Sequence, residues 1–187
     1  MEDSTQSIRL GRFEFLAMNN PIRRLRQKRR EFPLFLKMLR MHGIDLSGKV
    51  IMDMGCGSGF GTELIIKELK PSQVIAFDLM PEQIELAKKR DLHVDFKVGD
   101  ATAIDAPDSS CNAIFDFCIL HHIPLWRNAL AEVVRVLVPE GVLLIEEPHR
   151  MFEWDEFELG IQRAGLSIME RRQWYGGHMR FFLTQKI

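Results

Sequence analysis

The chain has 187 residues, 46% of them apolar, and its 25 Lys and Arg nearly balance 26 Asp and Glu, for a net charge of −1. A domain of this length buries enough surface to fold without a disulfide or a structural metal. Three cysteines without a C-x-x-C pair exclude a zinc finger and a disulfide-rich scaffold. The first residues resemble no secretion signal, and no apolar run reaches the ~18 residues of a membrane span. We therefore expect a soluble, cytoplasmic protein.

Residues 1–48 are predicted to form an N-terminal helical cap, and residues 49–187 the main domain. Apolar residues recur at helical spacing in the cap. Pro21 divides the cap into two helical pieces, because proline disfavours helix at the residue before it. Gly43 is expected to end the second piece.

The predicted cap is basic. Residues 1–48 carry ten basic and five acidic side chains, whereas residues 49–187 carry 15 and 21. Most of the excess lies in residues 21–30, PIRRLRQKRR. The simplest interpretation is the solvated face of a helix; the alternatives are contact with an acidic substrate, an anionic membrane surface or nucleic acid. The near-neutral charge of the whole chain weakens the last of these.

From residue 50 onward, short apolar runs alternate with amphipathic segments, which predicts an α/β fold with a largely parallel sheet. Strands are expected at 50–55, 74–79, 93–99, 112–120 and 141–147, and helices near 60–69, 81–90 and 153–164. Two more strand-like runs, 167–175 and 178–187, flank Gly176-Gly177. Such a glycine pair predicts an antiparallel hairpin.

A glycine-rich turn, MDMGCGSGFGT at residues 52–62, follows the first strand. Gly55 and Gly57 allow positive φ and a close approach of ligand to backbone, and the next helix begins with unpaired N–H groups. The dinucleotide pattern G-x-G-x-x-G fails, because its last position falls on Phe60 or Thr62. Asp53 precedes the glycines and suits a cationic amine better than a pyrophosphate.

Two more acids follow strands of the predicted sheet. Asp78 ends the second strand, where a carboxylate can accept the hydroxyls of a ribose. Asp100 and Ala101 follow the third, where a side-chain acceptor and a backbone N–H can meet an adenine. Any one of these acids could be only a cap or loop carboxylate. Three consecutive strand ends nevertheless predict adjacent amine, ribose and base sites.

These motifs resemble those of the class I S-adenosylmethionine-dependent methyltransferases, of the small-molecule type related to quinone-biosynthesis enzymes. The resemblance covers residues 50–187, through MDMGCGSG, VIAFDL, VGDATAIDAPDSS, ILHHI and LVPEGVLLIEE. It implies a three-layer, Rossmann-like sheet of order 3-2-1-4-5-7-6 with strand 7 antiparallel, S-adenosylmethionine as cofactor, S-adenosylhomocysteine as product, and no metal. The cofactor-binding residues expected on this basis are Asp53, Gly55, Cys56, Gly57, Asp78, Leu79, Asp100, Ala101, Asp116 and Phe117.

One position departs from the family pattern. Members usually start the fourth strand with Phe-Asp, where this chain has Cys111-Asn112, and an acid follows at Asp116. Asp116 is expected at the carboxyl end of that strand. There it would bind the cofactor amine or the acceptor, or be a plain loop carboxylate.

Methyl transfer from a sulfonium is an in-line displacement, so the protein mainly positions the reactants and removes a proton if the acceptor carries one. His121 and His122 beyond the fourth strand, and Glu146 at the end of the fifth, are the candidate catalytic residues. The cap is expected to cover the site. Its candidate lining residues are Phe13, Phe15, Met18 and Arg24. For the aromatic residues among them, core packing is the alternative.

The predicted function is methyl transfer to an apolar or anionic small molecule. The alternatives are a catalytically silent cofactor-binding module and a methyltransferase that acts on a macromolecule. The family's motif for planar amines is absent at residues 116–119, which argues against nucleic acid. A monomer and a homodimer both remain open, and Trp154 and Trp174 would suit a dimer.

Overall fold

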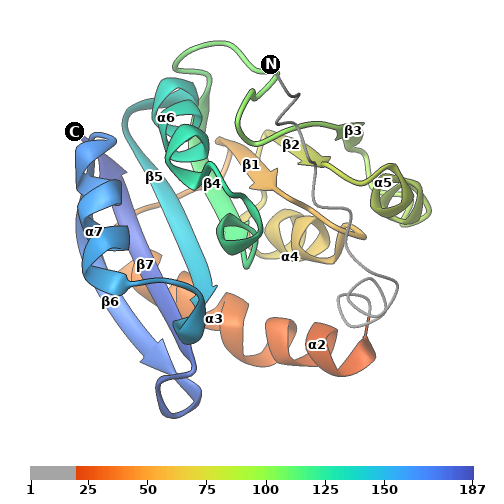
Figure 1. Cartoon of the computed structure of the whole chain (residues 1–187). Helices are drawn as coiled ribbons and strands as arrows, with labels where there is room; N and C mark the ends of the chain where they lie inside the picture. Colours follow the sequence, from red (N-terminus) through yellow and green to blue (C-terminus); the bar gives the residue numbers. More distant parts are fainter. Residues whose placement is uncertain (1–19) are drawn as a thin grey trace, which may run out of the picture.

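The computed structural model describes residues 20–187, apart from the side chain of Tyr175. Its centre is a seven-stranded sheet of order β3-β2-β1-β4-β5-β7-β6 (Figure 1). The strands are β1 (Val50–Met54), β2 (Gln73–Asp78), β3 (Asp95–Val98), β4 (Cys111–Phe117), β5 (Leu137–Pro148), β6 (Leu166–Trp174) and β7 (Met179–Lys186). Neighbouring strands are parallel except where β7 pairs with β5 and β6. The predicted order and the antiparallel strand are confirmed.

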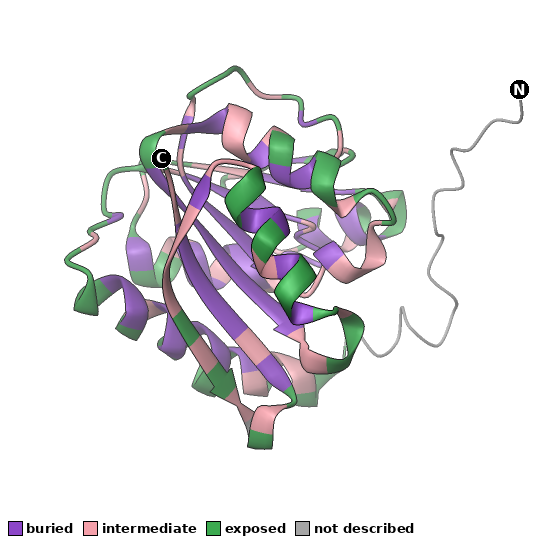
Figure 2. Ribbon diagram, turned by 60° about the vertical axis from the view of Figure 1, so that its left-hand side comes forward, coloured by how far each residue is buried: buried purple, intermediate pink, exposed green. Residues whose placement is uncertain are grey.

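Helices cover both faces of the sheet. They are α2 (Pro21–Arg26), α3 (Phe32–Met41), α4 (Phe60–Leu69), α5 (Pro81–Lys88), α6 (Trp126–Val136) and α7 (Trp154–Arg163). One apolar layer joins α6 and α7 to the sheet, and a second joins α3 and α4 to the opposite face. A smaller cluster packs α5 against β2 and β3. Figure 2 shows the buried strands between exposed outer helix faces.

The second piece of the predicted cap is a single helical rod, residues 21–41. A π-helical stretch, η1 (Gln27–Glu31), joins α2 to α3 and turns both Gln27 and Glu31 inward. Phe32 and Phe35 of α3 are buried against Phe115 and Phe117 of β4. The rod therefore packs directly on the sheet. The first predicted piece, with Phe13, Phe15 and Met18, lies outside the described residues.

Several element ends differ from the prediction for local reasons. The fourth strand was expected to reach residue 120 but ends at Phe117, because Cys118 adopts a φ of +66°. The 3₁₀ turn η2 (Leu120–His122) follows. The fifth strand is longer than expected, because its ends pair with β4 and β7. Helix α6 was not specified, although its apolar residues recur at helical spacing.

The Gly-Gly hairpin has the expected backbone. Gly176 and Gly177 adopt φ values of +63° and +91°, which only glycine reaches without strain, and Trp174 pairs with Met179 across the turn. Trp154, a candidate for a dimer contact, is instead buried in the core and donates its indole N–H to the His149 carbonyl (2.6 Å). Its ring is thus unavailable to a partner.

Phe35→Ala tests how firmly the helical rod is attached. Phe35 is fully buried, and its ring lies 5.5–5.8 Å from those of Phe115, Phe117 and Phe181. We expect a loss of about 3–5 kcal/mol in the free energy of unfolding, measured in urea. Met41→Ala, on the exposed side of the same helix, serves as the control and should change it by less than about 0.5 kcal/mol. Equal effects would contradict the packing.

Candidate active site

The glycine turn lies between β1 and α4, at the carboxyl edge of the sheet. Gly55 and Gly57 both have positive φ, +70° and +52°. A Cβ at Gly55 would lie only 2.5 Å from Ile119 Cγ2, so glycine is needed there for the turn to contact the segment after β4. A Cβ at Gly57 would meet nothing within 4 Å. Gly55 therefore allows the turn to pack against Ile119, and Gly57 leaves open space beside the turn.

Asp53 lies beneath this turn and is almost fully buried. The Thr62 hydroxyl donates to its Oδ2 at 2.5 Å. Burial, together with the neighbouring Asp78 charge, raises the pKa of the Asp53 carboxyl to about 7. A cation beside Asp53 would stabilise the ionised form, so the site is suited to a positively charged ligand group.

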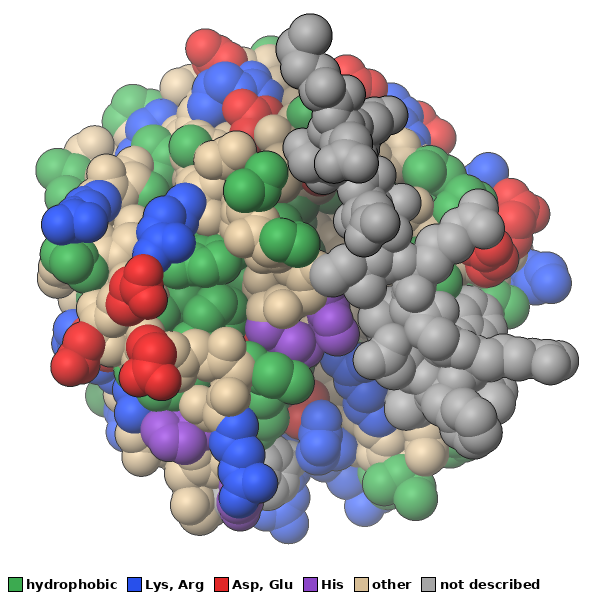
Figure 3. All heavy atoms as spheres, viewed as in Figure 1, with side chains coloured by type: hydrophobic (Ala, Val, Ile, Leu, Met, Phe, Trp, Pro, Cys, Tyr) green, Lys and Arg blue, Asp and Glu red, His purple; other side chains and the backbone are tan. Residues whose placement is uncertain are grey.

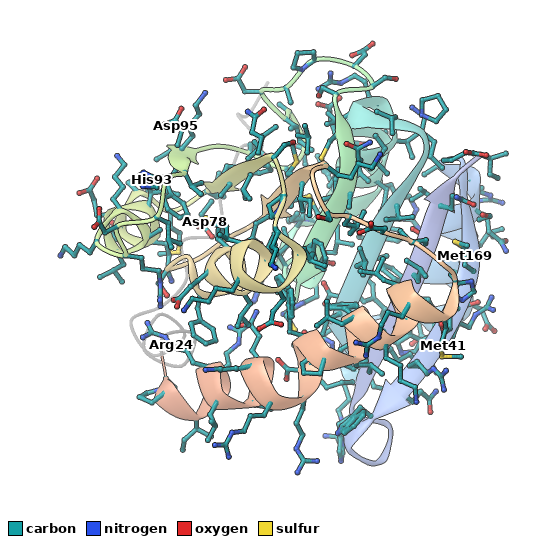
Figure 4. The ribbon with its side chains drawn as sticks, turned by 180° about the vertical axis from the view of Figure 1, so that it is seen from behind. Arg24, Met41, Asp78, His93, Asp95 and Met169 are labelled. Atoms are coloured by element: carbon teal, nitrogen blue, oxygen red, sulfur yellow. The ribbon has the colours of Figure 1, made fainter. Side chains whose placement is uncertain are left out.

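Asp78 holds the turn from the end of β2. Its Oδ2 accepts the Gly57 N–H at 2.8 Å, and its Oδ1 accepts the Met80 N–H at 2.9 Å. Each carboxylate oxygen has two lone pairs, so both can accept one more hydrogen bond. Figure 4 shows Asp78 and Arg24 on the same side of the molecule, Arg24 directed from α2 toward the sheet.

A pocket opens over the turn. Its lining residues are Arg23, Arg24, Gln27, Asp53, Gly55, Cys56, Gly57, Ser58, Phe60, Gly61, Gln83 and Phe117. Five of the residues expected at the cofactor are therefore together: Asp53, Gly55, Cys56, Gly57 and Phe117. The first amides of α4, which have no partner within the helix, belong to the same wall.

Helix α2 supplies the basic wall of the pocket. The Arg23 guanidinium donates to the Phe117 carbonyl and that of Arg24 to the Ser58 hydroxyl, both at 3.3 Å. The Nε of Arg24 is buried and has no hydrogen-bond partner among residues 20–187. Arg24 was expected to line the site, whereas Arg23, Gln27 and Gln83 were not. The basic run at 21–30 was the available signal for Arg23.

The other expected cofactor residues lie outside this lining. Leu79 is exposed, next to Asp78. Asp100 is exposed and accepts hydrogen bonds from the Thr102 amide and hydroxyl, at 2.8 and 2.9 Å. Ala101 is buried in the apolar layer beneath. Asp116 is completely buried and accepts the Ile119 N–H at 2.8 Å.

His121 is the histidine best fixed in place. Its Nδ1 lies 2.6 Å from Oε2 of the fully buried Glu147. Burial and the nearby Arg23 charge lower the pKa of His121 to about 4. Burial raises the pKa of Glu147 to about 8. The ring of His122 packs on that of His121, with centroids 3.9 Å apart. Figure 3 shows histidine side chains at a recess in the centre of this face, beside apolar and basic side chains.

Two further acids are buried behind these histidines. Burial and the neighbouring Glu31 carboxyl raise the pKa of Glu146 well above its usual range, and burial and Glu147 do the same for Asp116. Glu146, a candidate catalytic residue, lies in the interior against η1 and outside the pocket lining. Glu31 was not expected in the site. It is buried in η1 and faces Glu146 of β5.

Within residues 20–187 no group of three or more His, Cys, Asp or Glu is arranged to hold a metal ion. The cysteines of the described chain are unpaired, and burial raises the pKa of Cys56 well above its usual value. The chemistry available at the pocket is therefore that of carboxyl, guanidinium, imidazole and backbone amide groups.

Comparison with known proteins agrees with this geometry. A methyltransferase domain model matches residues 51–141. Over 132 residues the chain is 37% identical to the phthiotriol/phenolphthiotriol dimycocerosates methyltransferase of Mycobacterium tuberculosis, covering 70% of this chain and 49% of that protein. It is 28% identical to the fatty-acid O-methyltransferase of Mycolicibacterium smegmatis, covering 68% and 47%. The chain spans about half the length of the curated relatives it matches.

The fold comparison extends over nearly the whole chain. The crystal structure of an S-adenosylmethionine-dependent methyltransferase from Aquifex aeolicus superposes with a TM-score of 0.80 at 18% identity, covering 96% of this chain and all of that one. The sheet order with antiparallel β7 and the glycine turn at the carboxyl edge define a Rossmann-like methyltransferase domain. The chain belongs to the class I S-adenosylmethionine-dependent methyltransferases.

Substitutions of the two glycines should separate folding from binding. Gly57→Ala should cost about 1–2 kcal/mol of stability for its left-handed φ, and its methyl group should fill open space and weaken S-adenosylmethionine binding. Gly55→Ala should cost more, because it adds the clash with Ile119 to the same φ penalty. Urea unfolding and calorimetric titration measure both effects. A smaller loss for Gly55→Ala than for Gly57→Ala would contradict the packing.

Proposed function

We propose that this chain transfers the methyl group of S-adenosylmethionine to an oxygen atom of a small, apolar, lipid-like acceptor. The observation that supports this best is the pocket, where buried Asp53 and the two arginines of α2 face an open glycine backbone. The named acceptors of the relatives, a fatty acid and phthiotriol or phenolphthiotriol dimycocerosates, support the lipid-like class.

The residues present fit the cofactor's amino-acid end. That end is a zwitterion, and the pocket offers a buried carboxylate for its ammonium group and guanidinium donors for its carboxylate. The buried Nε of Arg24, without a partner among the described residues, is the donor a carboxylate would satisfy. Asp53, Arg23 and Arg24 are thus the residues proposed to hold the methionine moiety.

Asp78 is proposed to hold the ribose with the lone pairs that its two backbone hydrogen bonds leave free. Asp100 and the Ala101 amide are proposed for the adenine. When bound, S-adenosylmethionine supplies an electrophilic methyl group on its sulfonium. The chain itself must hold the acceptor oxygen in line with that methyl group and, where that oxygen carries a proton, as in a hydroxyl, take up the proton.

His121 is proposed as the proton acceptor, and Glu147 as the residue that sets its tautomer. When Glu147 is ionised it accepts the Nδ1–H of His121 and leaves Nε2 with a free lone pair. When Glu147 is protonated it donates to Nδ1, and Nε2 carries the hydrogen. Only the first state can remove a proton from an acceptor hydroxyl through Nε2.

The segment after β4 supplies apolar surface for the acceptor. Ile123 is half-buried and Leu125 is 62% exposed, and both follow His121 directly in the chain. Exposed apolar side chains next to a polar reaction centre favour a ligand with an apolar body and one reactive oxygen. This is the basis for the proposed acceptor class.

The first experiment is calorimetric titration with S-adenosylmethionine, S-adenosylhomocysteine and NAD, followed by radiolabelled methyl transfer to fatty acids and long-chain alcohols. Binding of the two sulfur compounds without NAD, and label in an ester or ether, is the expected result. No binding of either sulfur compound to folded protein would overturn the proposed cofactor. Binding with label only in nitrogen or carbon products would overturn the acceptor class.

Cofactor affinity should depend on pH through Asp53. Its raised pKa of about 7 means that a proton must leave before the carboxylate can hold the ammonium group. Affinity should therefore rise between pH 5 and pH 7, by up to about ten-fold per unit, and level off above pH 7. Asp53→Asn should bind weakly with a flatter profile. Asp95→Asn, on exposed β3, should retain the wild-type curve.

The reaction rate should depend on pH through Glu147. Because the base-competent tautomer needs ionised Glu147, kcat/KM should rise with pH through about 8. His121→Gln should lower kcat by about 10²–10⁴-fold, and more than His122→Gln, because the hydrogen bond to Glu147 orients His121. Glu147→Gln should remove the rise near pH 8. An unchanged profile in Glu147→Gln would refute its role as a positioning residue.

A further inference from the structure

The outer face of the helical rod, residues 21–41, has a composition unlike the rest of the surface. The rod carries eight basic side chains and one acid, and that acid, Glu31, is buried. The outward stripe, at spacings of three and four residues, consists of Ile22, Leu25, Arg29, Pro33, Lys37 and Arg40, all exposed. This stripe, with Lys28 and Arg30 beside it, is called the basic stripe below.

The basic side chains of this stripe make no polar contact with the rest of the described structure. Lys28, Arg29, Arg30, Lys37 and Arg40 form no salt bridge or side-chain hydrogen bond with any residue of 20–187. Figure 4 shows several long side chains on the outer side of the rod directed away from the body of the molecule, with Met41 at the far end of the rod. The stripe therefore presents unneutralised positive charge to solvent.

Exposed apolar side chains lie within the same surface. Ile22 is 74% exposed and Leu25 49% at one end of the rod, and Met41 is 59% exposed at the other. Basic side chains attract anionic lipid headgroups, and exposed apolar side chains beside them add binding by burial at the bilayer interface. No described helix is long and apolar enough to cross a membrane.

We propose that the basic stripe docks the protein on an anionic lipid surface, with Ile22 and Leu25 inserted among the headgroups. Residues 49–187 carry a net charge of 15 − 21 = −6, so an anionic surface attracts the basic stripe and repels the main domain. Nucleic acid or an acidic protein would use the charge but gain less from the exposed Ile22 and Leu25. This inference does not depend on the proposed methyl transfer.

The orientation has a consequence for the site. Arg23 and Arg24, on the opposite side of the same helix, line the pocket over the glycine turn. Docking through the stripe would hold the pocket one helix diameter, about 10 Å, above the lipid surface. The pocket would then lie close to a source of apolar acceptors.

The test is co-sedimentation of the full chain with phosphatidylcholine vesicles and with vesicles that also contain phosphatidylglycerol. We expect binding only to the second kind, weakened by salt. Replacing Lys28, Arg29 and Arg30 by Gln should lower the partition coefficient about 100-fold, or about 5-fold for each charge. Ile22→Ser with Leu25→Ser should also weaken binding but leave its salt dependence.

The matched control removes the same charge elsewhere. Lys89, Arg150 and Arg163 are exposed and form no ion pair with any residue of 20–187, and their replacement by Gln should leave vesicle binding unchanged. Circular dichroism verifies that each variant is folded. Equal binding to both vesicle types, or equal losses in the two triple variants, would overturn the proposal. Tighter binding to duplex DNA than to vesicles, unaffected by the serine variants, would overturn it in favour of nucleic acid.

Discussion

The packing of Phe32 and Phe35 on Phe115 and Phe117 is the contact on which the rest of the site depends. It fixes α3 against the face of β4, and the unbroken helical rod then carries α2 across the carboxyl edge of the sheet. Arg23 and Arg24 reach the glycine turn only because of this anchor. The same rod turns its opposite side to solvent, so one helix serves both the pocket wall and the basic stripe.

A second constraint is the burial of carboxyl groups behind the pocket. Glu31, Asp116, Glu146 and Glu147 are at most 3% exposed, and an ionised carboxylate without compensation is costly at such depth. Burial raises the pKa values of all four carboxyl groups, which favours their neutral forms. The Arg23 charge lies near Glu31, Glu146 and Glu147 and favours their ionised forms. Arg23 thereby couples the pocket to the histidine pair, since its charge also lowers the pKa of His121.

The proposed cofactor site and the proposed acceptor site share one short segment of the chain. Family members need a pocket that positions the cofactor and an acceptor site next to it, and here both border the short segment between β4 and α6. Ile119 packs under the glycine turn, and His121 follows two residues later. A change in the position of that segment would therefore alter cofactor binding and proton removal together.

The sequence by itself determined the order of the strands, the antiparallel hairpin and the glycine turn. The hairpin and the turn follow from local chemistry, namely a Gly-Gly pair with positive φ and glycines between a strand and a helix. The strand order was expected from the resemblance of the motifs to a known family. Asp53, Gly55 and Gly57 could be placed together because they belong to one strand and the turn that follows it, whereas Phe117 was expected from the family resemblance. The end of β4 was misjudged, since the left-handed φ of Cys118 has no signal in the residue type.

Only the tertiary structure decided which side chains meet across long separations. Arg23 contacts Phe117 over 94 positions of sequence, and His121 contacts Glu147 over 26. The tertiary structure also places Glu146 and Asp116 in the interior, where burial raises the pKa of each carboxyl group. The spacing of apolar residues in a sequence predicts that a helix has a buried face. Which strand that face meets depends on packing, because the apolar contacts that hold it are not directional.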